Sequence, residues 1–114
     1  MVAKKRINGR TATQYVQTRT EFKNSNGQLY GEWKHLVGRS HYTVYSYGVH
    51  WPLFIYDLEH KLWFENSSKY SPTTSKHRSY AHPHCDTKSL TVDQMRQLDA
   101  QGYHEFALAR LTDE

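Results

Sequence analysis

Residues 41–66, "HYTVYSYGVHWPLFIYDLEHKLWFEN", hold the strongest strand-forming material in the chain and decide its fold class. They are rich in Tyr, Val, Phe, Ile and Trp, which fit the pleated surface of a sheet. Residues 42–47 predict one strand, and 52–57 predict a second that is apolar on both faces, as a central strand is. Pro52 lacks a backbone N–H and therefore marks a strand start or an edge. A polar turn at 57–60 joins the second strand to a third at 61–65, which completes a hairpin.

An earlier hairpin is predicted upstream of this stretch. Residues 11–22, "TATQYVQTRTEF", are rich in β-branched side chains and favour a strand. Asn26 and Gly27 follow, and both residue types accept the positive φ of a tight turn. The returning strand, 28–37, alternates between a buried and a wet face. Its two faces carry Leu29, Trp33 and Val37 on one side and Tyr30, Glu32 and Lys34 on the other.

The clearest helix lies near the C-terminus, at residues 91–101. Thr91 and Gln94 have the spacing of a capping box, and Gly102 supplies a stop signal. Met95 and Leu98 form its apolar stripe, so this short helix should dock on the sheet. Residues 103–114 fit either a strand or a second helix. These patterns together predict an α+β fold: a twisted antiparallel sheet of four to six strands, built from two hairpins and packed by one C-terminal helix.

A chain of 114 residues has the length of one ordinary domain. Residues 1–10 are basic and almost free of large apolar side chains, so we predict a flexible basic arm there. Residues 11–114 then form a single α+β domain. Within this domain, residues 66–90 show no periodicity, and a structureless segment of that length in a small domain is usually functional or disordered. We therefore predict a long functional loop at 66–90.

The charge of the chain is unevenly distributed. The formal net charge is +4, with basic segments at 1–40 and 66–90 and an acidic segment at 91–114. This pattern fits a folded domain that presents one positive face to a polyanion, although it also serves solubility. Cys85 is the only cysteine, which excludes an intramolecular disulfide and favours a reducing cytoplasm. No apolar run approaches the roughly 18 residues that span a membrane, and the first ten residues lack an export signal, so we expect a cytoplasmic protein without membrane partners.

The predicted loop carries the pattern of a nucleic-acid site. Lys and Arg side chains, Ser and Thr hydroxyls and backbone N–H groups all donate to phosphate oxygens. Aromatic rings beside such a basic groove stack on the bases of single strands. The competing interpretation is a solvated loop, or for the rings a structural plug. The candidate residues are Tyr47, His50, Trp51, Lys69, Tyr70, Thr74, Ser75, Lys76, His77 and Arg78.

Imidazoles in the same region raise the question of a metal or an enzyme. His77, His82, His84 and Cys85 are suitable zinc ligands by residue type, but their spacing matches no established signature. We therefore expect no bound cofactor. The alternative is a zinc ion, which is the metal that these ligands would suit. No catalytic spacing is present either: the chain lacks a phosphate-binding Gly-rich loop, a nucleophile elbow and a His-Glu-x-x-His motif. The sequence thus favours a binding protein over an enzyme.

Two motifs resemble those of a family of small proteins encoded by bacteriophages and other mobile elements. In that family a Tyr-Ser-Tyr-Gly-x-His-Trp-Pro-like corner precedes a Lys-Tyr-Ser-x-Thr-Thr-Ser-Lys-His-like segment. The resemblance covers residues 42–80 and implies a phage origin, but no mechanism, because the family carries no established activity. The matching positions are Tyr45, Tyr47, His50, Trp51, Lys69, Tyr70, Ser71, Thr73, Thr74, Ser75, Lys76 and His77.

The sequence therefore predicts a small, basic, phage-type accessory protein that binds nucleic acid without catalysis, in the cytoplasm of an infected bacterium. One alternative is a protein-binding, anti-CRISPR-like inhibitor of a host defence system, whose partner would be a host nucleic-acid-binding complex. The other is a metal-dependent phosphodiesterase. The choice between DNA and RNA and the oligomeric state stay open.

Overall fold

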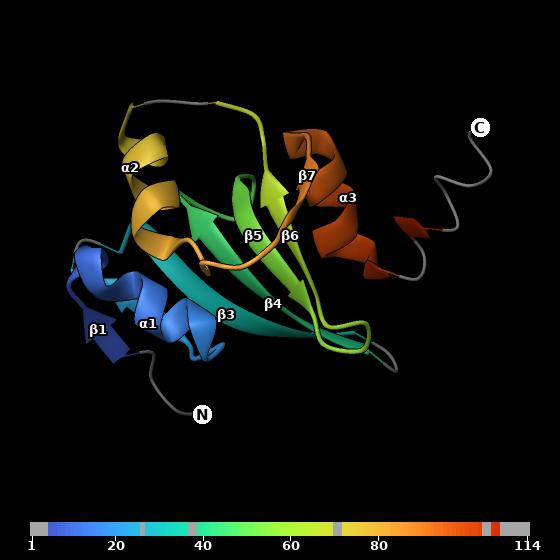
Figure 1. The fold of residues 1–114 in the computed structure, drawn as a ribbon, viewed down its shortest axis with the longest axis horizontal. Helices are drawn as coiled ribbons and strands as arrows, with labels where there is room; N and C mark the ends of the chain where they lie inside the picture. The colour runs from blue at the N-terminus through green and yellow to red at the C-terminus, as the bar shows by residue number, and fades with distance from the viewer. Residues whose placement is uncertain (1–4, 26, 37–38, 70–71, 104–105, 108–114) are drawn as a thin grey trace.

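The computed structural model describes residues 5–25, 27–36, 39–69, 72–103 and 106–107. Within these ranges, seven strands form one sheet in which spatial order follows chain order (Figure 1). The strands are β1 (Lys5–Ile7), β2 (Phe22–Asn24), β3 (Leu29–Leu36), β4 (Arg39–Ser46), β5 (Pro52–Asp57), β6 (Leu62–Asn66) and β7 (Lys88–Leu90). The helical elements are the 3-10 turn η1 (Gly9–Thr11) and the helices α1 (Ala12–Gln17), α2 (Pro72–Ala81) and α3 (Val92–Gln101).

The predicted α+β class is confirmed, and the centre of the sheet matches the predicted strands. Strands β2 to β6 pair antiparallel in sequence, with β3 and β4 joined along eight residue pairs. All six residues of β5 are buried, in agreement with its position inside the sheet. The predicted number and direction of strands are wrong, however. The sheet has seven strands, and it is mixed because β1 pairs parallel with β2 and β6 pairs parallel with β7.

Both parallel pairs are closed by a helical crossover. Parallel neighbours cannot be joined by a tight turn and need a longer connection, usually a helix. Here η1 and α1 connect β1 to β2, and α2 connects β6 to β7. Figure 1 shows the segment after α2 crossing the strands to reach β7. The prediction of a single C-terminal helix is therefore wrong, because two further helices serve as crossovers.

Residues 12–17 form helix α1 instead of the predicted strand. A six-residue helix is unstable in isolation, so tertiary contacts must override the β-propensity of its threonines. Ala12 and Val16, one helical turn apart, are fully buried. On its outer side, Thr13 Oγ1 donates to the His82 carbonyl at 2.5 Å and Gln17 Nε2 donates to the Pro83 carbonyl at 3.1 Å. These contacts join residues that are 69 and 66 positions apart, so the local sequence does not reveal them.

The predicted arm at 1–10 is also corrected in part. Residues 5–7 form β1, which pairs with β2, and Ile7 is buried in the core. Arg6 donates to the Ser25 carbonyl at 2.9 Å. A basic segment can thus serve as an edge strand when one apolar side chain reaches the core. The first four residues of the predicted arm lie outside the described residues.

The predicted loop at 66–90 contains helix α2 and strand β7. Pro72 stands at the first helical position, where its missing N–H costs nothing. The buried stripe of α2 consists of Thr74, His77 and Ala81, which follow helical spacing but are mostly polar. Hydrophobic periodicity therefore could not reveal this helix, because its inward face binds through hydrogen bonds rather than through apolar burial.

Helix α3 agrees with its prediction in detail. Thr91 Oγ1 accepts from the Gln94 N–H at 3.3 Å, and Gln94 Oε1 accepts from the Thr91 N–H at 2.9 Å, which completes the capping box. Gly102 ends the helix with a φ of 82°. Of the ambiguous tail, residues 103, 106 and 107 are helical and Phe106 is buried, while 108–114 lie outside the described residues.

Two apolar clusters lie on opposite faces of the sheet. One joins Val16 of α1 and Ala81 of α2 to strand residues that include Phe22, Tyr42 and Phe54. The other joins Met95 and Leu98 of α3 to Ile55, Phe64 and Phe106. Gly31 is required on the first face, because a Cβ there would clash with the Tyr42 hydroxyl and lie 2.7 Å from the Phe22 ring. Among the described residues, no helix has the length and apolar character to cross a membrane.

Candidate nucleic-acid interface

The chain turns sharply between β4 and β5, at residues 46–52, which we call the corner. Tyr47 and Gly48 have positive φ values of 67° and 136°, and the first is unusual for a residue with a side chain. The Tyr47 N–H donates to the Gln28 carbonyl at 2.7 Å, and the Trp51 N–H donates to the Gly48 carbonyl at 3.1 Å. These bonds hold a conformation in which Tyr47 and Val49 stay exposed while Trp51 is buried. A strained backbone held in this way is often found at functional sites.

Helix α2 packs against the corner through a buried polar contact. Ser46 Oγ lies 2.8 Å from His77 Nδ1 and donates to Thr74 Oγ1 at 3.4 Å. The Tyr47 ring packs on the imidazole of His77, with 5.6 Å between ring centres. The two motifs of the phage-family resemblance therefore meet in space, because Ser46 and Tyr47 belong to the first motif and Thr74 and His77 to the second.

The buried state of His77 gives this contact a defined pH dependence. Burial lowers the pKa of His77 below its ordinary value of 6.5, so the imidazole is neutral at pH 7. As the pH falls below 6.5, the imidazole is protonated more readily in the unfolded chain than in the folded chain. The contribution of His77 to the free energy of unfolding is therefore fully present above pH 6.5 and decreases as the pH falls.

We predict that His77→Gln makes the free energy of unfolding less dependent on pH between 7 and 5. The reason is that the variant has no imidazole at this buried position. Urea denaturation at several pH values measures the effect. His50→Gln is the matched control, because His50 is exposed on the same corner; a loss of pH dependence in the control but not in His77→Gln would contradict the assignment.

The predicted nucleic-acid residues divide into exposed and structural groups. Tyr47, His50, Lys69, Ser75 and Lys76 are exposed, whereas Trp51, Thr74 and His77 are buried. Arg78 is also structural: its Nη2 donates to the Asn66 carbonyl at 2.5 Å and the Ser68 carbonyl at 3.1 Å, and its Nε lies 3.8 Å from Glu65. Tyr70 lies outside the described residues. The interface predicted from the sequence is therefore reduced to its exposed members.

Contacts between distant segments bring these exposed residues to one end of the sheet. Arg78 holds the start of the 67–69 connection, and Ser68 Oγ accepts from the Val92 N–H of α3 at 3.0 Å. Arg96 of α3 reaches the corner, where its Nε donates to the His50 carbonyl at 2.6 Å. Figure 1 shows the N-terminal ends of α2 and α3 and the C-terminal ends of β6 and β7 at this same end, the top of the view.

Electrostatically, this end is positive. Throughout the part of the chain that the structure describes, Lys69 and Lys76 form no ion pair, and Arg96 pairs with Asp93 at 3.2 Å. Helix α2 has no acidic residue in its first turn, so the partial positive charge of its N-terminus is not offset there. The end can therefore attract an anion through two ammonium groups that no described acidic residue neutralises.

The four candidate zinc ligands do not converge. His77 is bound to Ser46 beneath the corner. His82 Nδ1 accepts from the His84 N–H at 2.9 Å, and its Nε2 lies 3.3 Å from Glu65. Cys85 is exposed. Within the described ranges, no three His, Cys, Asp or Glu side chains gather around a point that could hold a metal ion.

A buried polar cluster that was not predicted from the sequence centres on Asp99 of α3. Its carboxylate accepts from Thr43 Oγ1 at 2.7 Å, Tyr45 Oη at 2.5 Å, His41 Nε2 at 2.9 Å and Lys34 Nζ at 3.0 Å. Burial would raise the pKa of Asp99, but these hydrogen bonds outweigh it and lower the pKa from 3.8 to about 2. One sequence pattern could have revealed this cluster. Polar residues stand at alternate positions, His41, Thr43 and Tyr45, of a strand whose other face is buried.

The chain was also compared with known proteins. No protein-family model, curated protein or solved structure matches it.

Proposed function

We propose that the protein is a small, non-enzymatic, phage-type accessory protein that binds nucleic acid in the bacterial cytoplasm. The contact surface, which we call the corner surface, consists of Tyr47, His50, Lys69, Ser75 and Lys76. The observation that carries this proposal is the presence of two exposed lysines, which form no ion pair with any described residue, at the end of the sheet where Tyr47 is exposed.

The chemistry of the corner surface suits a phosphate backbone. Lysine ammonium groups and the Ser75 hydroxyl donate to phosphate oxygens. Tyr47 adds a ring that rests on His77 and keeps 37% of its surface exposed, so it can stack on an accessible base. Because His77 and Arg78 are engaged within the fold, they act by positioning this surface rather than by touching the nucleic acid.

The test is the salt dependence of binding by the unaltered protein. We expect duplexes of unrelated sequence to bind with similar affinity, and the logarithm of the association constant to fall linearly with that of the salt concentration. Two phosphate contacts predict a slope near −2, since each contact contributes roughly −0.9. Fluorescence anisotropy with labelled DNA and RNA duplexes measures it. Binding without salt dependence, or no binding at low salt, would contradict the proposal.

A second function, an anti-CRISPR-like inhibitor that docks on a host protein complex, is favoured by a different observation. Val49 is 63% exposed beside Tyr47, which gives the corner an apolar tip suited to a protein partner. Capture from host lysate separates the two functions. A stoichiometric protein complex that survives nuclease treatment, and that is lost in Val49→Asp, would favour the inhibitor; capture that nuclease abolishes would favour nucleic-acid binding.

A further inference from the structure

The ring of Tyr47 is exposed, which distinguishes it from the other aromatic side chains of the chain. Of the Tyr, Trp and Phe residues that the structure describes, Tyr47 alone is exposed; the others are buried or half-buried. Its φ of 67° lies in the left-handed region, where glycine or asparagine is less strained. The corner therefore holds a large aromatic side chain at a position that favours small residues.

The Tyr47 ring is also fixed in place before any ligand arrives. The backbone N–H donates to the Gln28 carbonyl at 2.7 Å, and the ring rests on the imidazole of His77 with 37° between the two planes. His77 is held in turn by Ser46 Oγ, which lies 2.8 Å from its Nδ1. Since the ring is already ordered, little conformational freedom is lost when a ligand stacks on it.

The lysines of the corner surface belong to the same unit of the fold as this ring. Lys76 directly precedes His77, so helix α2 carries both the support of the ring and a cation. Lys69 follows Ser68, whose carbonyl accepts from Arg78 Nη2 of α2 at 3.1 Å. The corner surface therefore joins an open aromatic ring to two cations through a single helix.

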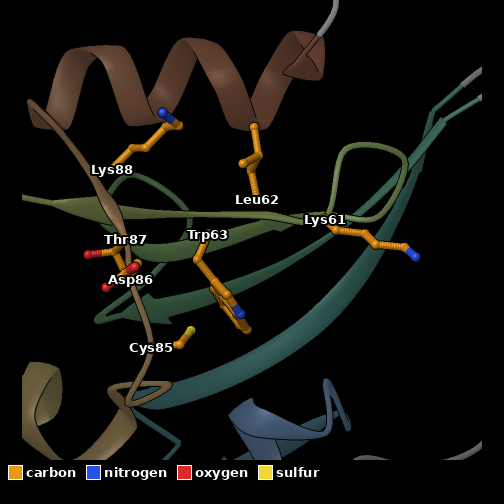
Figure 2. Close-up of a pocket in the computed structure, with 7 residues that line it drawn as sticks. All are labelled: Lys61, Leu62, Trp63, Cys85, Asp86, Thr87 and Lys88. Carbon is orange, nitrogen blue, oxygen red and sulfur yellow. The ribbon is translucent and has the colours of Figure 1, made fainter.

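The opposite end of β6 also has lysines and a ring, but it lacks this arrangement. A pocket of about 520 Å³ lies there, lined in part by Lys61, Trp63 and Lys88 (Figure 2). The Trp63 ring is buried against Tyr42 and Tyr56. Figure 2 shows the Lys61 and Lys88 side chains extending away from the pocket in opposite directions. That end offers no open ring beside its cations.

We propose that the corner surface prefers single-stranded nucleic acid to a duplex, because Tyr47 stacks on an unpaired base while Lys69 and Lys76 contact phosphates. This inference rests on the proposed function and names the class of nucleic acid that the surface binds. Both classes present phosphates, so the lysines by themselves do not discriminate between them. Inside a duplex every base is paired and stacked on both faces, whereas a single strand offers the face of any base to the ring.

The test compares an oligothymidine, which does not pair with itself, with the same strand annealed to its complement. Fluorescence anisotropy with the unaltered protein is measured at several salt concentrations. For the single strand we expect a salt slope near −1.4, since each of two phosphate contacts contributes roughly −0.7. Extrapolated to about 1 M salt, where counterion release no longer contributes, the single strand should bind about tenfold more tightly, as is typical of one base stacked on an aromatic ring.

Two replacements of Tyr47 identify the ring as the cause of this preference. Tyr47→Leu should lower the affinity for the single strand about tenfold and remove the preference, because leucine has no aromatic face to stack on. Tyr47→Phe should retain the preference. Leucine and phenylalanine both carry a Cβ, as tyrosine does, so the strain of the positive φ is common to all three proteins. Lys69→Ala with Lys76→Ala should weaken the binding of both nucleic acids and leave the ratio of their affinities unchanged.

The failure of this inference is distinguishable from the failure of the proposed function. Equal or tighter binding of the duplex at about 1 M salt, or a preference that survives in Tyr47→Leu, would overturn the inference and leave the proposed function intact. The comparison in the unaltered protein decides the first point without any variant. If neither nucleic acid binds at low salt, the proposed function is wrong and the inference is overturned with it.

Discussion

Replacing Asp99 with alanine is expected to lower the free energy of unfolding by about 3–5 kcal/mol, the usual cost of removing one partner from a buried ionic cluster. The variant leaves the His41 and Thr43 donors buried without their acceptor, and it frees α3 from β3 and β4. Lys34, whose side chain is 37% exposed, can turn to water and contributes less to this loss.

Urea denaturation of the variant and the unaltered protein measures the difference. Asp93→Ala is the matched control, because Asp93 lies on the same helix with 82% of its side chain exposed. We expect the control to cost less than about 1 kcal/mol, as is typical for exposed ion pairs. Similar losses in both variants would show that the Asp99 cluster does not anchor the helix.

The same cluster should dominate the response of the protein to acid. Because the folded pKa of Asp99 is about 2 and its ordinary value is 3.8, the carboxylate contributes stability that is present above pH 3.8 and lost as the pH falls toward 2. The difference corresponds to roughly 2 kcal/mol. This window lies below that of His77, so acid titration of the two variants separates the two groups.

Replacing both Lys69 and Lys76 with alanine is expected to weaken duplex binding by at least about tenfold at low salt and to reduce the salt slope by about two units. The loss should be uniform across sequences, because phosphate contacts carry no base information. The stability of the fold should not change, since both side chains are exposed.

Lys61→Ala with Lys88→Ala is the matched control for this experiment. It removes the same charge from exposed positions at the opposite end of β6. Equal weakening in the two double variants would indicate attraction by net charge alone and would contradict a localised surface.

The strands at the centre of the sheet were predictable because the residues that specify each strand are close together in the sequence. In residues 41–66, the apolar residues either alternate with polar ones or form short continuous runs, as is typical of strands. The turns between these strands contain residue types that favour turns. Helix α3 was predictable for the same reason, since Thr91, Gln94 and Gly102 specify its ends by themselves. In both places, local preference and tertiary structure agree.

The crossover helices were not predictable because their stability is non-local. Helix α1 depends on hydrogen bonds from Thr13 and Gln17 to the segment after α2, and α2 buries Thr74 and His77 against Ser46. Without these helices, the parallel edge strands β1 and β7 had no visible connection and were missed. The mixed sheet therefore arises from contacts between segments that are far apart in the chain.

The residues of the candidate site were chosen from the sequence by their type, and the sequence did not show which of them are buried. The basic pattern at 69–78 drew attention to Lys69 and Lys76, which are exposed, but it could not distinguish them from His77 and Arg78, which are engaged inside the fold. Asp99 was missed because a single acid in a helix resembles a solvated residue until the strand beneath it is known.

The measurement that tests the corner surface most directly is amide chemical-shift mapping of ¹⁵N-labelled protein during titration with a short duplex. We predict that the perturbed signals concentrate in residues 47–50, 67–69 and 72–77, which belong to three segments that only the fold brings together. Perturbations centred instead on the residues around Lys61 and Lys88, or the absence of any perturbation at low salt, would contradict the account.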